Sequence, residues 1–273
     1  MAPQNSPPHH YHPVLTNKEA AQTISVLGIR KANSKAWQLL LLGLLAGIYI
    51  AIGAHLFLVA MQAGMGRLAG GVAFSVGLTL VVVAGAELFT GNLIMVVGTL
   101  TRLFSLGRMF RNWGAVYAGN LAGALIFVAL IQGAGLLSRQ GVVTPLGAYA
   151  ADVAAAKLQL TFGEALIRGV LCNMLVILAI IMALLSKDNI SKVVCCTLPI
   201  AAFVASGFEH CVANMYLIPA GLLAQGARWS DLGVCVRNLV PVTLGNIVGG
   251  AAILMLHPNR IRQFMLLTRG KEI

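Results

Sequence analysis

The sequence predicts an all-α membrane protein with six transmembrane helices, which form two inverted three-helix repeats with broken second and fifth helices. Three observations lead to this fold. The chain is 58% apolar and only 10% charged, whereas a typical soluble domain is about 25% charged. Two long apolar runs each hold one Glu near the middle, followed five positions later by an Asn. Segments of the two halves also match one another at a nearly constant spacing.

The charged residues lie between the apolar segments rather than on one face. We therefore interpret the net charge of +11 as a topology signal, and nucleic acid is excluded as a partner. The five cysteines lie inside apolar segments and form no Cys-x-x-Cys pair. They are expected to be small core residues, neither disulfides nor metal ligands. No cofactor is expected.

The N-terminal residues 1–15 are polar and are predicted to form a disordered cytoplasmic tail. A capping box, Thr16-Asn-Lys-Glu19, predicts the start of an amphipathic helix over 16–31. Such a helix is expected to lie on the membrane surface. The chain then divides into a first three-helix repeat (32–137), a periplasmic connection (138–162), a second inverted repeat (163–258) and a basic cytoplasmic tail (259–273).

The continuous crossings are predicted at 37–61, 113–137, 163–185 and 238–256. The other two apolar runs, 68–101 and 193–227, would each measure about 50 Å as one helix, against a hydrocarbon core of about 30 Å. Each run is therefore predicted to be one crossing with a break, at 86–92 and at 206–214. Unwound backbone at that depth is tolerated only against protein or a water-filled cavity, so both breaks are expected to face a pore.

The internal repeat can be followed residue by residue. The segment 111–123 matches 237–249 at an offset of 126, and 43–47 matches 169–173 at the same offset. Three spans per repeat is an odd number, so the two copies must insert in opposite orientations. With both termini cytoplasmic, 13 of the 19 basic residues lie inside, which agrees with the positive-inside rule. The six outside are Arg67, Arg139, Lys157, Arg168, Arg228 and Arg237.

The two breaks carry recognisable motifs. Ala86-Glu-Leu-Phe-Thr-Gly91 and Ala205-Ser-Gly-Phe-Glu-His-Cys-Val-Ala-Asn-Met215 resemble the two signatures of the formate/nitrite transporter family. The resemblance covers about 18–258 and implies an aquaporin-like protomer, assembled in the lipid bilayer of the bacterial inner membrane as a homopentamer with one pore per protomer. The segments 215–219 and 238–246 resemble the formate channel branch. Formate is then the expected substrate, with nitrite, hydrosulfide and acetate as alternatives.

His210 follows Glu209 inside an apolar run. A bare anion in a low-dielectric constriction costs many kcal/mol, and an imidazole that shares a proton with a weak-acid anion removes much of this cost. The alternative is a core imidazole satisfied by backbone. The resemblance implies that His210 is the central pore histidine and that Thr90 hydrogen-bonds either this histidine or the passing anion. The alternative for Thr90 is a helix cap or an intrahelical bond.

Glu87 and Glu209 are expected to be structural, because a glutamate that lines the route would repel anions. Each is expected to accept hydrogen bonds from unwound backbone N–H groups. Asn92 and Asn214 are expected to act similarly, and the resemblance implies that Asn214 lies close to the histidine. Asn173 matches a family asparagine near the pore.

Five apolar residues match the family's hydrophobic constrictions. Phe74 and Phe203 correspond to the outer one, and Leu78, Leu88 and Phe89 to the inner one. Such constrictions reject hydrated ions by dewetting. The alternative is ordinary helix packing.

Lys157, in the predicted outer connection, is either a solvated lysine or, by the resemblance, a lysine that attracts anions into the outer vestibule. Asn120 and Asn246 each stand in a Gly-Asn-x-x-Gly pattern and are expected to be helix contact residues.

Other classes of protein lack their required residues here. A water or glycerol channel would need Asn-Pro-Ala loops, and the sequence has no Asn-Pro pair. No enzyme activity is expected, because Cys211 and His210 are neighbours on a helix and point about 100° apart. A function of another class stays open, namely a membrane docking site in which residues 1–31 bind a cytosolic formate-producing enzyme and gate the pore.

Overall fold

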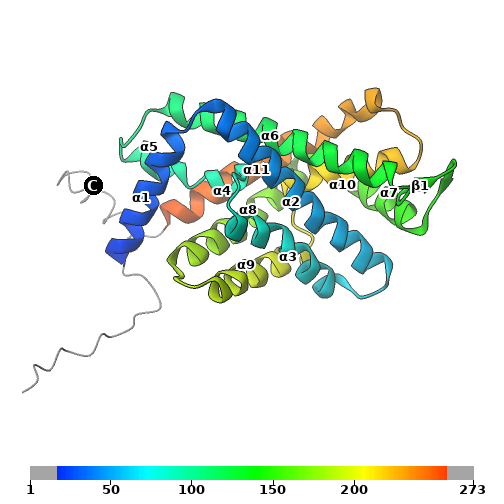
Figure 1. Ribbon diagram of the computed structural model, residues 1–273, viewed down its shortest axis with the longest axis horizontal. Helices are drawn as coiled ribbons and strands as arrows, with labels where there is room; N and C mark the ends of the chain where they lie inside the picture. Colours follow the sequence, from blue (N-terminus) through cyan, green and yellow to red (C-terminus); the bar gives the residue numbers. More distant parts are fainter. Residues whose placement is uncertain (1–16, 257–273) are drawn as a thin grey trace, which may run out of the picture.

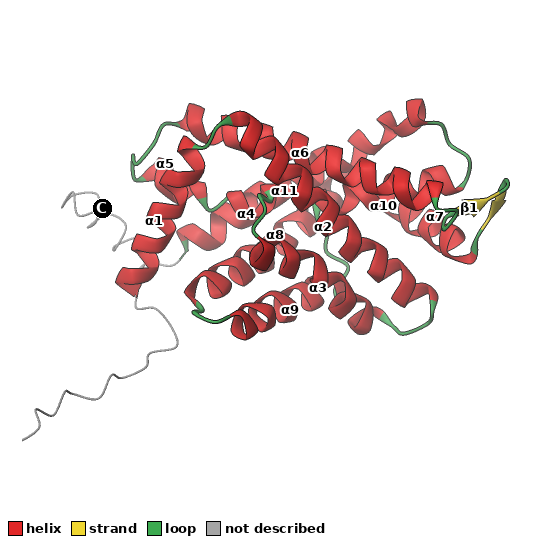
Figure 2. Cartoon of the chain, viewed as in Figure 1, coloured by secondary structure: helices red, strands yellow, loops and turns green. Residues whose placement is uncertain are grey.

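The computed structural model describes residues 17–256, in which helices joined by loops make up the regular structure apart from one short hairpin (Figure 2). In the first half the elements are α1 Asn17–Asn33, α2 Ala36–Gln62, α3 Arg67–Ala84, α4 Phe89–Asn92, α5 Met95–Leu100 and α6 Leu106–Gly133. In the second half they are β1 Ser138–Arg139, β2 Val142–Val143, α7 Pro145–Leu158, α8 Phe162–Leu185, α9 Asn189–Ala205, α10 Cys211–Ala224, the 3-10 helix η1 Trp229–Cys235 and α11 Val236–Met255. The two strands are antiparallel, with Ser138 opposite Val143.

Five of the described helices are long and apolar enough to cross a membrane: α2, α3, α6, α8 and the continuous η1–α11. The predicted continuous spans correspond to α2, α6, α8 and α11. α6 begins at Leu106, well before the predicted Trp113, because the Ser105 hydroxyl accepts a hydrogen bond from the Arg108 N–H and caps the helix there.

The second and fifth membrane segments are both broken, as predicted. The first break separates α3 from α4, and the second separates α9 from α10. Helix resumes sooner than the ranges 86–92 and 206–214 predict, at Phe89 and at Cys211. The motif residues that follow each break therefore lie in the first turn of a helix.

A left-handed glycine turns the chain at each break. Gly85 has φ 82° and Gly207 has φ 73°, a conformation that costs any other residue about 1–2 kcal/mol. No neighbouring atom lies within 4 Å of a Cβ built at either position. Backbone conformation alone therefore demands glycine here.

The two halves use the same helix pairs. α2 packs along α6 and α8 packs along α11. A Cβ on Gly119 would lie 2.5 Å from the Leu40 carbonyl oxygen, and one on its repeat partner Gly245 would lie 2.1 Å from the Leu166 carbonyl oxygen. α3 and α9 lie side by side where the halves meet (Figure 1).

α1 packs its apolar face against the protein itself, whereas the sequence analysis expected this face to lie on the membrane surface. Ala20, Ile24 and Ser25 are buried, and a Cβ on Gly28 would contact the Phe104 ring at 3.3 Å. The apolar face of α1 is covered by the α5–α6 region instead of lipid. The predicted tails, 1–15 and 259–273, lie outside the described residues.

The predicted connection 138–162 contains a hairpin and a full helix, α7, which Thr144 caps through the Gly147 N–H. When the repeat offset of 126 is added to the residue numbers of α1, the resulting range nearly coincides with α7. The two short helices lie at opposite ends of the molecule (Figure 1). Each repeat therefore begins with a short helix, which the predicted boundaries at 32 and 163 leave out.

Apolar side chains cover the outside of the described molecule. Leu41, Leu130 and Leu198 are 55%, 62% and 66% exposed. A soluble protein rarely exposes so much contiguous apolar surface to water. The interior in turn holds buried asparagines and two carboxylates. The cysteines are free thiols, four of them buried.

Candidate functional site

A buried cluster of four polar side chains joins α1, the first break and α6. Lys31 Nζ donates to Glu87 Oε2 at 2.6 Å and to Asn92 Oδ1 at 2.8 Å. Asn92 Nδ2 in turn donates to Glu87 Oε2 at 2.7 Å and to Asn112 Oδ1 at 2.8 Å. Asn112 completes the ring by donating to the Lys31 carbonyl oxygen at 3.1 Å.

The second repeat contains the same cluster. Lys157 Nζ donates to both oxygens of Glu209, at 2.8 and 3.0 Å. Asn214 Nδ2 donates to Glu209 Oε2 at 2.6 Å and to Asn238 Oδ1 at 2.7 Å, and Asn238 donates to the Lys157 carbonyl oxygen at 2.9 Å. The two lysines differ in their acceptors. Lys31 donates to one glutamate oxygen and to the asparagine, whereas Lys157 donates to both oxygens of the glutamate.

The partners of the two glutamates differ from the expectation. Their carboxylates accept hydrogen bonds from lysine and asparagine side chains, not from unwound backbone N–H groups. The physical reason is that a buried carboxylate needs a countercharge, which a backbone amide does not supply. Lys31 was missed by the sequence analysis, although the repeat offset of 126 leads from Lys157 directly to it.

Asn120 and Asn246 hold the breaks in shape, a larger role than the helix contact expected of them. Asn120 Oδ1 accepts the Phe89 N–H at 2.9 Å, and its Nδ2 donates to the carbonyl oxygens of Gly43 and Glu87 at 2.8 and 3.0 Å. Asn246 makes the three equivalent bonds in the second repeat, at 2.8–2.9 Å. At each break, one asparagine side chain thus hydrogen-bonds both a free backbone N–H and free backbone carbonyl oxygens.

His210 is the residue that starts α10. Its Nδ1 accepts the Ala213 N–H at 3.1 Å, so the imidazole acts as the helix N-cap. Its Nε2 lies 2.9 Å from Thr90 Oγ1. Because Nδ1 faces an N–H donor, the neutral ring carries its proton on Nε2 and donates it to the threonine oxygen. The Thr90 hydroxyl proton then remains available to another acceptor.

A cavity of about 620 Å³ ends at the imidazole; we call it the Lys157 cavity. Its wall includes Lys157, Phe74, Phe203 and Asn214 beside His210. The Phe203 ring stacks on the His210 ring at 6.0 Å and meets Phe74 edge-on at 5.7 Å. The two phenylalanines expected to form a constriction therefore lie together beside the histidine.

A second cavity, of about 700 Å³, lies beside the Lys31 cluster of the first repeat; we call it the Lys31 cavity. Glu87, Leu88, Gly91 and Asn92 line it. Thr90 is fully buried between Phe89 and Gly91 and lines neither cavity. The Thr90–His210 hydrogen bond therefore joins the wall of the Lys157 cavity to a buried residue whose neighbour, Gly91, lines the Lys31 cavity.

The remaining predicted site residues are distributed as follows. Leu78 and Phe89 are buried outside both cavity walls, and the Phe89 ring meets Trp113 and Tyr117 edge-on at 6.0 and 5.0 Å. Asn173 lies in the α8–α11 contact, where it donates to the Asn246 carbonyl oxygen at 2.8 Å, and it also lines neither cavity.

Comparison with known proteins identifies the family of the chain. The formate/nitrite transporter family matches residues 18–258. A probable formate transporter of Methanothermobacter thermautotrophicus is 42% identical over 255 residues, which cover 85% of this chain and 92% of the relative. The formate channel FocA of Escherichia coli K12 is 36% identical over 262 residues, which cover 86% and 90%. These relatives are channels and transporters, not enzymes.

Solved structures share the fold. A pentameric formate channel with formate bound has a TM-score of 0.67 at 35% identity, over 81% of this chain and 95% of that chain. An FNT family ion channel has a TM-score of 0.73 at 30% identity, over 86% and 94%. With its paired broken helices, its apolar exterior and this match along most of its length, the chain is a multi-pass membrane protein of the formate/nitrite transporter family.

Proposed function

We propose that the protein is a homopentameric channel or proton-linked transporter for small monovalent anions, formate first, in the bacterial inner membrane. Both termini are cytoplasmic, so that the Lys157 cavity opens to the outside and the Lys31 cavity to the cytoplasm. The similarity to formate channels, one of them pentameric with formate bound, supports the substrate and the assembly.

The observation that carries the proposal is the Thr90–His210 hydrogen bond of 2.9 Å between the two cavities. The Nε2 proton polarises the threonine hydroxyl, whose own proton is directed to the anion. This pair offers the permeating anion a hydrogen-bond donor at the point where water is excluded, and a donor there lowers the cost of the charge.

A full proton transfer requires one proton from the water of the Lys157 cavity, whose wall includes His210. The ring accepts it at Nδ1 and releases the Ala213 N–H. The Nε2 proton then moves to the threonine oxygen, the hydroxyl proton moves to the anion, and a neutral acid and a neutral ring result. The acid passes Phe74, Phe203 and, on the other side, Leu78, Leu88 and Phe89 without its charge.

The buried polar residues have supporting roles in this proposal. Glu87 and Glu209, each paired with a lysine, fix the breaks without adding net charge to the route. Asn92 and Asn214 orient these carboxylates. Lys157 keeps the wall of its cavity polar beside the phenylalanines.

The test is formate flux in proteoliposomes across pH, with His210→Asn and Thr90→Ala. Asparagine is a good N-cap and preserves the bond to the Ala213 N–H, so this variant removes the titratable ring but keeps α10 capped. We expect His210→Asn to lower flux by about tenfold or more, equal to about 1.4 kcal/mol, and to flatten its rise toward low pH. Thr90→Ala should lower flux in the same direction.

Thr101→Ala is the matched control, because the Thr101 hydroxyl bonds back to the carbonyl oxygens of Val97 and Gly98 in the preceding helix. It should conduct like the unmodified protein. If His210→Asn keeps both the rate and the pH dependence, the histidine does not share a proton. Parallel assays with nitrite, hydrosulfide and acetate rank the alternative substrates.

No contact among the described residues favours the docking platform over a pore. The apolar face of α1 is buried and Lys31 is engaged with Glu87, so a cytosolic enzyme would have to bind the segment before α1 or the exposed face of this helix, which includes Val26 and Arg30. Deletion of residues 1–15 separates the two functions: flux in liposomes should survive it.

A further inference from the structure

The charged residues of the Lys157 cavity do not all contribute to the net charge that an approaching anion meets. Two of its charged residues, Lys157 and Glu209, are bonded to each other at 2.8 and 3.0 Å, with side chains only 14% and 5% exposed. From the mouth of the cavity, such a tight pair has little net charge. Lys157, which the sequence analysis favoured for attracting anions, is therefore poorly suited to draw an anion from solution.

Three further charged residues line the same cavity and are exposed: Arg67, Asp152 and Arg168. Arg67 begins α3, Arg168 lies in the second turn of α8, and Asp152 belongs to α7. None of them is in an ion pair with another described residue. Glu164, one turn before Arg168, is occupied by the Thr161 N–H and hydroxyl and lies outside the cavity wall. The mouth therefore has two free guanidinium groups and one carboxylate.

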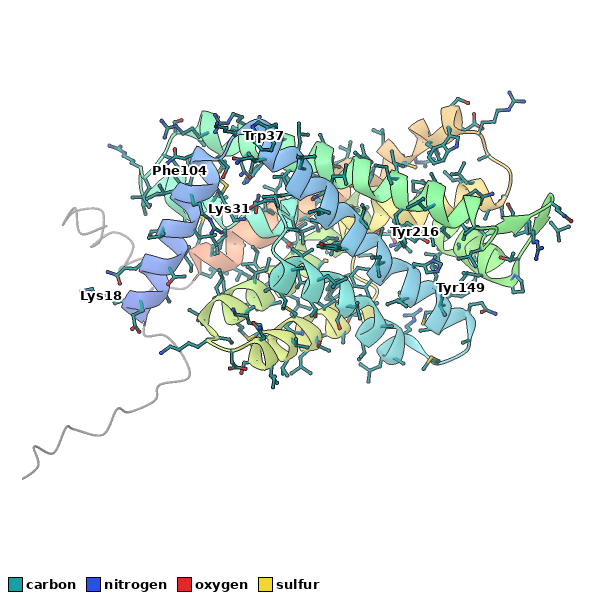
Figure 3. All side chains as sticks on the ribbon, in the orientation of Figure 1. Lys18, Lys31, Trp37, Phe104, Tyr149 and Tyr216 are labelled. Carbon is teal, nitrogen blue, oxygen red and sulfur yellow. The ribbon has the colours of Figure 1, made fainter. Side chains whose placement is uncertain are left out.

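The equivalent position in the other repeat lacks this feature. At the offset of 126, Arg168 corresponds to Leu42, and the Lys31 cavity has only Arg30 beside its own lysine–glutamate pair. The two cavities lie in opposite halves of the molecule, as Lys31 and the cavity residue Tyr149 show (Figure 3). Both cavity walls carry a net charge of +1, but two exposed arginines outside the lysine–glutamate pair line only the Lys157 cavity.

We propose that Arg67 and Arg168 are the residues that capture the anion at the Lys157 cavity and favour planar anions over spherical ones. The proposal rests on the proposed transport function. Two exposed guanidinium groups beside a cleft attract an anion electrostatically, and such attraction raises the local concentration of the anion and its rate of entry. A guanidinium also binds the two oxygens of a carboxylate in a fork, which it cannot do with hydrosulfide.

The experiment measures initial flux from the Lys157 side against substrate concentration, at low and high ionic strength. In the double variant Arg67→Gln/Arg168→Gln, the half-saturating formate concentration should rise about fivefold to tenfold at low ionic strength, and the maximal flux should be unchanged. The difference should shrink at high salt, because exposed charges are screened. The half-saturating concentration should rise for formate and nitrite more than for hydrosulfide.

Arg139→Gln is the matched control, since Arg139 is exposed on the hairpin and lies outside the cavity. Asp152→Asn removes the opposing carboxylate and should lower the half-saturating concentration. An unchanged half-saturating concentration in the double variant, an equal change in the control, or a loss of maximal flux alone overturns the capture role. If the unmodified protein conducts no anion, the proposed function itself has failed, and the two failures are thereby distinguished.

Discussion

At the scale of single residues, the two buried carboxylates among the described residues are each paired with a lysine instead of isolated. Lys31 and Glu87 are both 9% exposed or less and form a 2.6 Å ion pair. A buried ion pair contributes little net stability, but a single partner left in the interior is strongly destabilising. The lysine is therefore needed mainly because the glutamate is there.

The first prediction concerns this pair. Lys31→Met should lower the free energy of unfolding by about 3–5 kcal/mol, because it leaves the Glu87 carboxylate without a countercharge. Thermal or denaturant unfolding in detergent measures the effect. Lys18→Met, the same change at an exposed position of the same helix, should have almost no effect.

The double variant Lys31→Met/Glu87→Gln should recover most of the stability lost in Lys31→Met, because the carboxylate that lost its partner is gone. If the double variant is as unstable as the single one, the lysine acts through packing of α1 and the ion-pair argument does not hold.

At the scale of elements, the decisive features are the two breaks. Each combines a left-handed glycine, a carboxylate held by a lysine, and an asparagine from α6 or α11 that binds the free backbone groups. The resumed helix then directs its N-terminal end, the positive end of the helix dipole, toward the centre of the molecule. A continuous helix would bury neither the imidazole nor the threonine in these positions.

The second prediction concerns the glycine of the second break. Gly207→Ala should destabilise the protein by about 1–2 kcal/mol, through backbone strain alone, since no atom lies within 4 Å of the added Cβ. Gly114→Ala is the matched control: Gly114 lies inside α6, also with open space around its Cβ. There the same change should stabilise by up to about 1 kcal/mol. Equal effects in the two melting curves would contradict the strained turn.

At the scale of the whole molecule, two near-copies frame a site that is not symmetric. At the motif offset of 122, His210 corresponds to Leu88 and Thr90 to Val212. The lysine, glutamate and asparagine residues of the frame are duplicated, whereas the imidazole and its hydroxyl partner each occur once. The shared frame can thus be attributed to the fold, and the unshared pair is the one to which the proposed function assigns the anion.

The third prediction concerns assembly and orientation. Native mass spectrometry in detergent should give five copies of the 28.7 kDa chain, because the proposed pore unit is a homopentamer. A monomeric or dimeric mass would contradict this assembly.

Epitope tags at the two termini should both be cleaved from the cytoplasmic side of membrane vesicles and neither from the outside, because most of the basic residues lie on that side.

Local sequence was sufficient for features that depend on composition and spacing. The membrane spans, the two breaks and the repeat could be predicted, since apolar length, glycine placement and spacing are local signals. The nearness of His210 to Thr90 was implied only by the resemblance of the two motifs to those of the family. The short helix α7 was missed because its alanine-rich sequence lies in a segment that resembles a loop by its position between spans. Lys31 was missed because α1 could equally have lain on lipid.

The sequence by itself determined that the chain is a membrane protein of two related halves with polar, interrupted segments at its centre. Only the tertiary structure decided which groups meet there: that each glutamate is neutralised by a lysine 56 or 52 positions away, that Asn120 and Asn246 fasten the breaks, and that Lys157 is paired with Glu209 whereas Arg67 and Arg168 line the same cavity outside any ion pair of the described residues. The reason is physical. A buried charge accepts any countercharge that the fold brings within reach, and the spacing of residues along the chain does not specify which one that is.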